Sequence, residues 1–257
     1  MKNRNIHTFI GCDNEYDESN IVVFGAPFDS TTSFRPGTRF ASAVMRNESF
    51  GIETFSPYQD KDLEDLSVFD GGDLELSFGD SNSALNDIET YVGKVLSDSK
   101  VPFMIGGEHS VTLGAVRAVA KKYPDLHIVQ FDAHTDLRED YLGQVYSHAS
   151  VIRRCWDIVG DNKIFQFGIR SGEKVEFEWA KEHVHTTRFN FDGLDEIIRQ
   201  AHAQAVVKPN AALFDRQAHA RHAAHLLRHA ERAALELVRQ LCRQLQIGDG
   251  LHVRIHG

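Results

Sequence analysis

Short apolar runs alternate along this chain with segments whose apolar residues repeat at helical spacing. Gly, Pro or Asp bounds the runs, and we interpret four of them, at 21–24, 101–105, 127–131 and 164–167, as buried parallel strands. Apolar side chains three or four positions apart predict one helix over 83–99 and another that ends before Tyr123. This alternation is typical of an α/β fold, in which helices cover a mostly parallel sheet.

The overall composition is that of a globular protein. The chain has 257 residues, 42% hydrophobic residues and a net charge of −9, which argues against partners such as nucleic acid or an anionic membrane. Its N-terminus lacks a signal-like apolar segment, and no stretch reaches the roughly 18 apolar residues that a membrane span needs. Cys12, Cys155 and Cys242 lie far apart and suggest reduced thiols. We expect a soluble, cytoplasmic protein.

The composition changes near residue 197. Residues 1–196 contain 19 Lys or Arg and 33 Asp or Glu, whereas residues 197–257 contain 9 and 4, so the balance changes from −14 to +5. The second part also holds seven of the 14 histidines, and the Ala, Leu, Arg and Gln of 211–246 predict one long helix or two shorter ones. We therefore divide the chain into an α/β domain, 1–196, and a basic helical tail, 197–257.

Candidate metal ligands follow two of the predicted strands. His109 comes after the strand 101–105 and a pair of glycines, while Asp132, His134 and Asp136 come directly after the strand 127–131. Parallel strand ends share one edge of a sheet, so these oxygen and nitrogen donors can converge on one ion, with manganese preferred over zinc or iron. The alternative is that both aspartates cap a turn and His134 is incidental. The second strand end with His109 favours the metal site.

Seven motifs resemble those of the ureohydrolase (arginase/agmatinase) family, and together they span roughly residues 20–190. The two metal motifs are 106–110 (GGEHS) and 132–136 (DAHTD). Five further motifs favour the agmatinase branch: 25–29 (GAPFD), 34–40 (FRPGTRF), 70–73 (DGGD), 146–150 (YSHAS) and 168–171 (GIRS). The resemblance implies a three-layer, arginase-like fold, in which helices cover both faces of a mostly parallel sheet.

The resemblance also implies an activity and a set of roles. An agmatinase hydrolyses agmatine to putrescine and urea, a step of polyamine biosynthesis, when a hydroxide that bridges two Mn²⁺ ions attacks the guanidinium carbon. His109 and Asp136 would hold one ion, His134 the other, and Asp132 would bridge them. His148 would contact the substrate or pass a proton to the departing amine. Glu108 is expected to support the imidazole of His109. The family further implies a homo-oligomer.

The resemblance stops soon after residue 191. The family's later Asp-x-Asp-x-x-Asp-Pro motif is not found, so one ion would keep three protein ligands and the other only Asp132 and His134. An alternative function is therefore a catalytically impaired relative that acts as a binding protein. Asp215 could replace a missing carboxylate, but its Ala-rich helical context favours a solvated aspartate. Four tail histidines could bind metal, although biased composition explains them better: His219, His222, His225 and His229. Our hypothesis is that the tail is a frameshifted, recombined or misjoined replacement.

Overall fold

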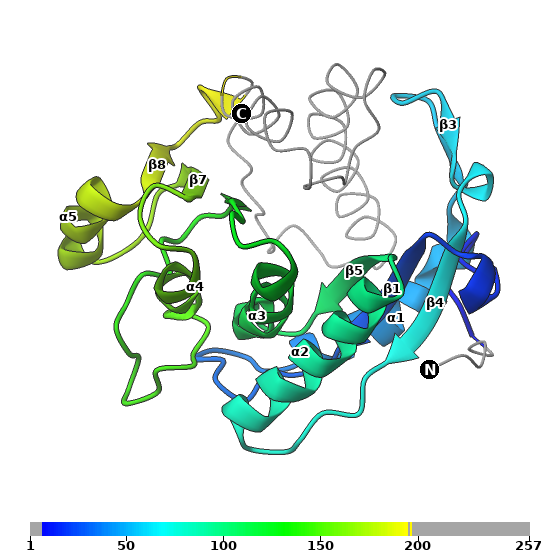
Figure 1. Cartoon of the computed structure of the whole chain (residues 1–257), viewed down its shortest axis with the longest axis horizontal. Coiled ribbons are helices and arrows are strands. Elements are labelled where there is room, and N and C mark those ends of the chain that lie inside the picture. Colours follow the sequence, from blue (N-terminus) through cyan, green and yellow to red (C-terminus); the bar gives the residue numbers. More distant parts are fainter. Residues whose placement is uncertain (1–6, 195, 197–257) are drawn as a thin grey trace.

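Six parallel strands form two three-stranded sheets in the computed structural model, which describes residues 7–194 and 196 (Figure 1). The first sheet has the order β4-β1-β5 and the second the order β6-β7-β8, with every neighbouring pair parallel. The strands are β1 (Ile21–Ala26), β4 (Val68–Asp73), β5 (Val101–Gly106), β6 (Ile128–Phe131), β7 (Ile164–Ile169) and β8 (His185–Arg188). A short antiparallel pair, β2 (Phe55–Ser56) and β3 (Lys61–Asp62), stands apart from them.

Helices connect the strands and pack against them. The α-helices of the described part are α1 (Ala41–Glu48), α2 (Ser81–Ser97), α3 (Thr112–Lys122), α4 (Val151–Val159) and α5 (Lys174–His183). α2 and α3 correspond to the two helices that the apolar spacing predicts, and α3 packs between α2 and α4 (Figure 1). Asp80 caps α2, because its side chain accepts the backbone N–H of Asn82 at 3.0 Å.

The two faces of β1 explain its continuous apolar sequence. Val22 and Phe24 point into a core that α2 covers, whereas Val23 joins a second cluster with Cys12 and Val68 on the opposite face. A strand that is buried on both faces needs apolar residues at successive positions instead of alternate ones. The prediction of a buried strand at 21–24 is therefore confirmed.

β5 and β6 differ from the prediction that they are buried strands. Phe103 is 58% exposed on β5, and Phe131 is 40% exposed on β6. Each strand is the outer member of its sheet and has one strand neighbour among the described residues. The apolar run identified the strands correctly, but it did not reveal that they lie at two separate sheet edges.

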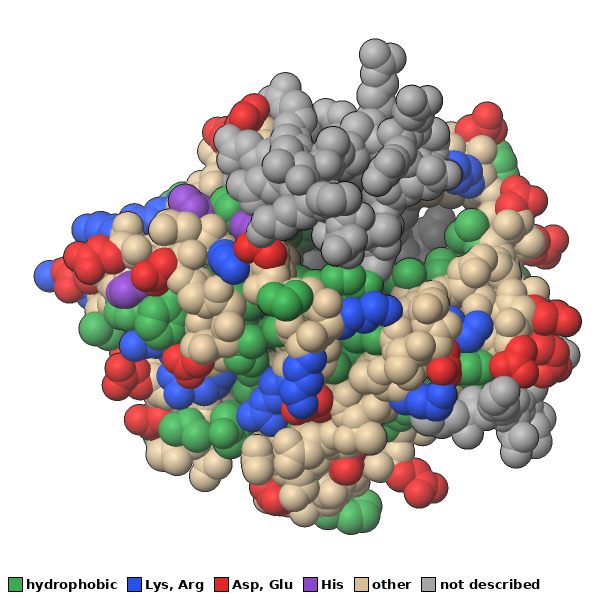
Figure 2. All heavy atoms as spheres, viewed as in Figure 1, with side chains coloured by type: hydrophobic (Ala, Val, Ile, Leu, Met, Phe, Trp, Pro, Cys, Tyr) green, Lys and Arg blue, Asp and Glu red, His purple; other side chains and the backbone are tan. Residues whose placement is uncertain are grey.

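The basic tail, with Asp215 and the histidines at 219–229, lies outside the described residues. Within the described part, no helix is both long and apolar enough to cross a membrane. Figure 2 shows acidic and basic side chains intermixed on the face in view, with apolar side chains between them.

Asp29 organises the loop that follows β1. Its carboxylate is 3% exposed and accepts hydrogen bonds from the backbone N–H of Gly37 at 2.7 Å and from Nε of Arg39 at 2.6 Å. Burial opposes ionisation of Asp29, but these hydrogen bonds outweigh it and hold its pKa below the ordinary value of 3.8. The ionised form therefore stabilises the loop.

A pH-dependent loss of stability is expected when Asp29 is replaced by asparagine. A carboxyl group whose pKa is lowered by folding stabilises the fold above its ordinary pKa and loses this contribution as the pH falls through the folded value. The difference in unfolding free energy between wild type and Asp29→Asn should be about 1.5–3 kcal/mol at pH 7. Urea denaturation should show this difference shrinking below pH 3.8. The exposed Asp65→Asn is the control, and a pH-independent difference would contradict the assignment.

Candidate metal centre

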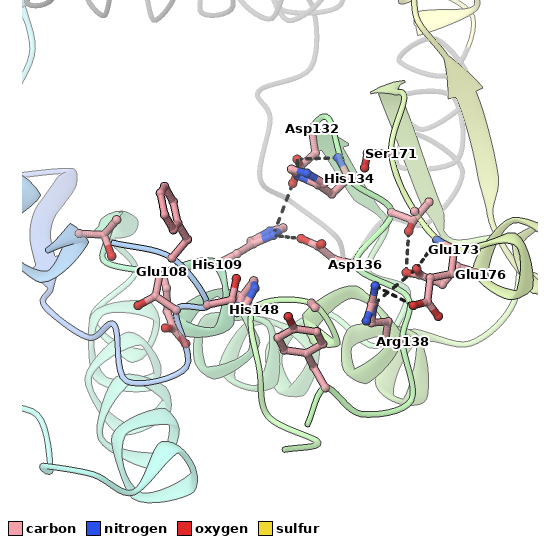
Figure 3. Close-up of a pocket in the computed structure, with 18 of the residues that line it drawn as sticks. Glu108, His109, Asp132, His134, Asp136, Arg138, His148, Ser171, Glu173 and Glu176 are labelled. Carbon is pink, nitrogen blue, oxygen red and sulfur yellow. Dashed lines mark hydrogen bonds and ion pairs between the residues drawn. The ribbon is translucent and has the colours of Figure 1, made fainter. Parts of the chain in front are cut away.

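Three side chains converge where β5 and β6 end (Figure 3). His109 follows β5 by three residues, Asp132 directly follows β6, and Asp136 lies four residues further along. One ligand atom from each lies within 4.8 Å of the others. Nδ1 of His109 is 2.7 Å from Oδ2 of Asp136 and 3.5 Å from Oδ2 of Asp132. These two carboxylates and one imidazole are the oxygen and nitrogen donors that a divalent cation such as manganese accepts.

The loop before His109 requires glycine at position 107. A Cβ atom on Gly107 would lie 1.9 Å from the carbonyl oxygen of Phe28, so any larger residue would force β5 and the loop after β1 apart. The backbone N–H of Glu108 donates to the same carbonyl oxygen at 2.7 Å. Because glycine has no Cβ atom, the two backbone segments can approach each other closely at this position.

The carboxylates around His109 favour a positive charge within this cluster. Burial opposes protonation of the imidazole, but the adjacent carboxylates of Asp136 and Asp132 outweigh it and raise the pKa of His109 above its ordinary value. Two carboxylates facing one imidazole therefore favour a positive charge between them. A proton on His109 supplies part of this positive charge, and a divalent cation supplies more of it.

His134 lies near the cluster but outside the group of three. Its side chain is 62% exposed, and its Nδ1 is 3.6 Å from Oδ1 of Asp132. The backbone N–H of His134 donates to the same carboxylate oxygen at 3.0 Å. An isolated β-bridge pairs the backbone of His134 with that of Ser171. The geometry thus brings together His109, Asp132 and Asp136, while His134 borders the cavity beside them.

Glu176 holds the loop that presents Asp136, and sequence reasoning did not identify it. Asp136 has a positive φ of 50°, so the chain leaves the extended conformation at this residue. Glu176 is 4% exposed, and one carboxylate oxygen accepts both the hydroxyl of Thr135 at 2.6 Å and the N–H of Leu137 at 3.0 Å. Both neighbours of Asp136 are therefore tied to α5.

Two buried glutamines support Asp132 in the same way. Nε2 of Gln130 donates to Oδ2 of Asp132 at 3.1 Å, and Nε2 of Gln166 donates both to Oε1 of Gln130 at 2.7 Å and to the carbonyl oxygen of Thr135 at 2.8 Å. The hydroxyl of Thr186 completes the row by donating to Oε1 of Gln166 at 2.9 Å. This row crosses from β8 through β7 to β6 and orients one oxygen of Asp132.

Glu108 supports a different group from the one expected. Its carboxylate is 4% exposed and accepts the backbone N–H of Thr31 at 2.9 Å and the hydroxyl of Ser110 at 2.5 Å, whereas the bonded partner of the His109 imidazole is Asp136. The expected support of His109 by Glu108 is wrong, because the carboxylate of Glu108 turns toward the loop after β1. Thr31 in turn contacts His148.

A cavity of about 660 Å³ contains the three converging side chains. His148 borders it from the segment that precedes α4, and Thr32, Phe34 and Tyr141 border it as well. The charged lining residues are five acids and one base: Glu108, Asp132, Asp136, Glu173, Glu176 and Arg138. The excess of carboxylates makes the cavity suitable for a metal ion together with a cationic small molecule.

The chain is similar to known proteins over most of its length. The model of a family described as the Arginase family matches residues 19–212. Agmatinases of Bacillus cereus and Bacillus subtilis are 48% and 46% identical to the chain, each over 74% of its length. The chain spans 65% and 66% of the lengths of these two relatives.

Solved structures agree with the fold. A candidate agmatinase from Clostridium difficile has a TM-score of 0.71 at 55% identity, and the match covers 72% of this chain and 68% of the Clostridium chain. The agmatine ureohydrolase of Thermoplasma volcanium has a TM-score of 0.69 at 37% identity, covering 77% of this chain and 68% of its own. The predicted α/β class with a parallel sheet is thus confirmed, and nothing in the comparisons supports the alternative of an impaired relative.

Proposed function

Because this chain belongs to the arginase family, we propose that it is an agmatinase-type hydrolase that converts agmatine and water to putrescine and urea. Water adds its oxygen to the guanidinium carbon, the bond from that carbon to the butylamine nitrogen breaks, and a proton reaches the departing nitrogen. The convergence of His109, Asp132 and Asp136 at two strand ends carries this proposal. The agmatinase relatives support the choice of substrate.

The donor set fits manganese. His109, Asp132 and Asp136 would hold a manganese ion, and His134 together with Asp132 would contribute to a second. Manganese at such a site lowers the pKa of water and polarises the group under attack. His134 and Asp132 both line the cavity, and Nδ1 of His134 is 3.6 Å from Oδ1 of Asp132.

The chain's own residues bind the substrate and move the proton. Carboxylates from three loops and α5 surround the cavity, so they attract the cationic guanidinium and ammonium groups of agmatine. His148 borders the cavity and lies near His109, between Glu108 and Asp136 in the view of Figure 3. In the proposal it takes the proton that water loses and delivers it to the departing amine.

The test is product formation by the full chain. Protein incubated with manganese and agmatine should release urea and putrescine in equal amounts, while arginine, which carries an additional carboxylate, should react more slowly in this acidic cavity. Circular dichroism should confirm that the sample is folded. Folded, manganese-loaded protein that forms neither product would reject the proposal.

Glu176→Ala should weaken metal binding without removing a ligand. The variant frees Thr135 and Leu137, which flank Asp136 and fix its positive φ. Replacing a residue that supports a ligand reduces metal affinity about 10–100-fold, and we expect a loss of this size in a manganese titration. Glu178→Ala, an exposed position on the same helix, is the matched control. Equal affinities of the two variants would rule out the supporting role.

A further inference from the structure

The imidazole of His148 is held by the hydroxyl of one residue, Thr31. Oγ1 of Thr31 accepts the backbone N–H of His148 at 3.1 Å and lies 3.4 Å from its Nδ1. The ring of Tyr141 meets the imidazole edge-on, with the ring centroids 5.5 Å apart. The backbone, Nδ1 and the ring of His148 are therefore all constrained, although His148 lies in the loop between β6 and α4.

Thr31 has a single hydroxyl proton, and its direction can be deduced. Oγ1 donates to Oε1 of Glu108, whose other oxygen accepts the backbone N–H of Thr31 at 2.9 Å. Ser110 also donates to Oε1 at 2.5 Å, so the buried carboxylate is surrounded by three donors. A hydrogen bond to a carboxylate is stronger than one to a neutral imidazole, so the proton of Thr31 points to Glu108.

The direction of that proton determines which nitrogen of His148 carries hydrogen. With its proton directed at Glu108, Oγ1 of Thr31 presents only lone pairs to His148, and Nδ1 must donate to it. A neutral imidazole with hydrogen on Nδ1 has an unprotonated Nε2. Nε2 is then the ring nitrogen of His148 that can accept a proton, and His148 lines the cavity.

We propose that Thr31 is a positioning residue that holds His148 in the Nδ1–H tautomer and so keeps Nε2 as the proton acceptor of the cavity. The inference deepens the proposed function and rests on the role that it gives to His148. A reversed hydroxyl would place hydrogen on Nε2 and remove the acceptor. Glu108, a buried carboxylate that does not join the converging donors, thereby acquires a role.

Two substitutions separate the hydroxyl from the shape of the side chain. Thr31→Val keeps the size but removes the hydroxyl, and Thr31→Ser restores it. We expect Thr31→Val to lower kcat for agmatine about 100-fold, within the contribution of general acid–base catalysis, with a much smaller change in KM. Thr31→Ser should recover most of the loss. If Thr31 had only a structural role, Thr31→Ser would not restore kcat selectively while KM stayed nearly constant.

Nitrogen-15 NMR of the histidine-labelled full chain tests the tautomer without relying on activity. The spectra are recorded without manganese, and the signals of His148 are identified by their loss in His148→Gln. Wild type and Thr31→Ser should show the Nδ1–H pattern, and Thr31→Val should lose it. Thr90→Val removes an exposed hydroxyl on α2 that donates to the carbonyl oxygen of Asn86 at 2.8 Å, and it should leave the His148 signals unchanged.

The outcomes distinguish the inference from the proposed function. An Nε2–H pattern in wild type, or identical His148 signals in wild type and Thr31→Val, would overturn the inference even if the protein hydrolyses agmatine. The expected tautomer change in a folded protein that releases no urea would support the placement by Thr31 and reject the proposed reaction. An unchanged kcat in Thr31→Val would overturn the positioning role.

Discussion

Asp132→Asn should lower the affinity for manganese by at least about 100-fold, the upper end of the loss seen when only a supporting residue is replaced. The substitution keeps the size of the side chain but removes the charge that faces His109 at 3.5 Å. Asp132 would also contribute to both proposed ion sites, so its loss affects both. Urea release from agmatine should fall with the affinity. Equilibrium dialysis with manganese, followed by the urea assay, measures both effects.

The matched control for this substitution is Asp157→Asn. Asp157 is an exposed acid on α4, where it pairs with Arg154 at 3.2 Å, outside the residues that line the cavity. It removes the same charge at a distance from the proposed centre. If both variants bound manganese as tightly as wild type, Asp132 would not be a ligand.

Arg46→Met should destabilise the fold by about 3–5 kcal/mol, the cost of removing one partner from a buried ion pair. Arg46 is 5% exposed on α1, and its guanidinium donates to both oxygens of Asp70 on β4, at 2.8 and 3.1 Å. Asp70 is 1% exposed, so the variant leaves its carboxylate buried without the arginine. Urea denaturation of the full chain measures the loss.

Lys94→Met provides the control for buried charge. Lys94 pairs with Asp98 one helical turn away at 2.7 Å, and its side chain is 51% exposed. Removing such an exposed pair costs only about 0.3–0.5 kcal/mol. Similar losses in Arg46→Met and Lys94→Met would show that the pair with Asp70 has no special part in holding α1 to the sheet.

Much of the fold could be predicted from local pattern. The runs at 21–24 and 164–167 became buried strands because helices or loops cover both of their faces, and the helical spacing at 83–99 matched α2 within two residues at each end. The exposure of β5 and β6 could not be predicted, since it depends on which strands lie beside them. The division at 196/197 stays a prediction, because the tail lies outside the described residues.

The candidate metal ligands could be predicted from the sequence, but the residues that hold them in place could not. The motif 132–136 and His109 indicated the strand ends that meet. Glu176 lies 40 residues beyond Asp136, and its only local signal is the spacing from Glu173 that forms a capping box. Gln130 and Gln166 carried a weak signal, as polar residues within apolar strands. Their hydrogen bond between β6 and β7 depends on the tertiary structure, which the local sequence does not reveal.

The dependence of agmatine hydrolysis on manganese tests the account most directly. Urea release by the folded, full-length chain would be followed as a chelator removes metal and as manganese is added back. We expect activity to fall to background and to return with manganese. Turnover that persists in the metal-free protein, or that is absent after manganese has bound, would contradict a metal-dependent hydrolase built on His109, Asp132 and Asp136.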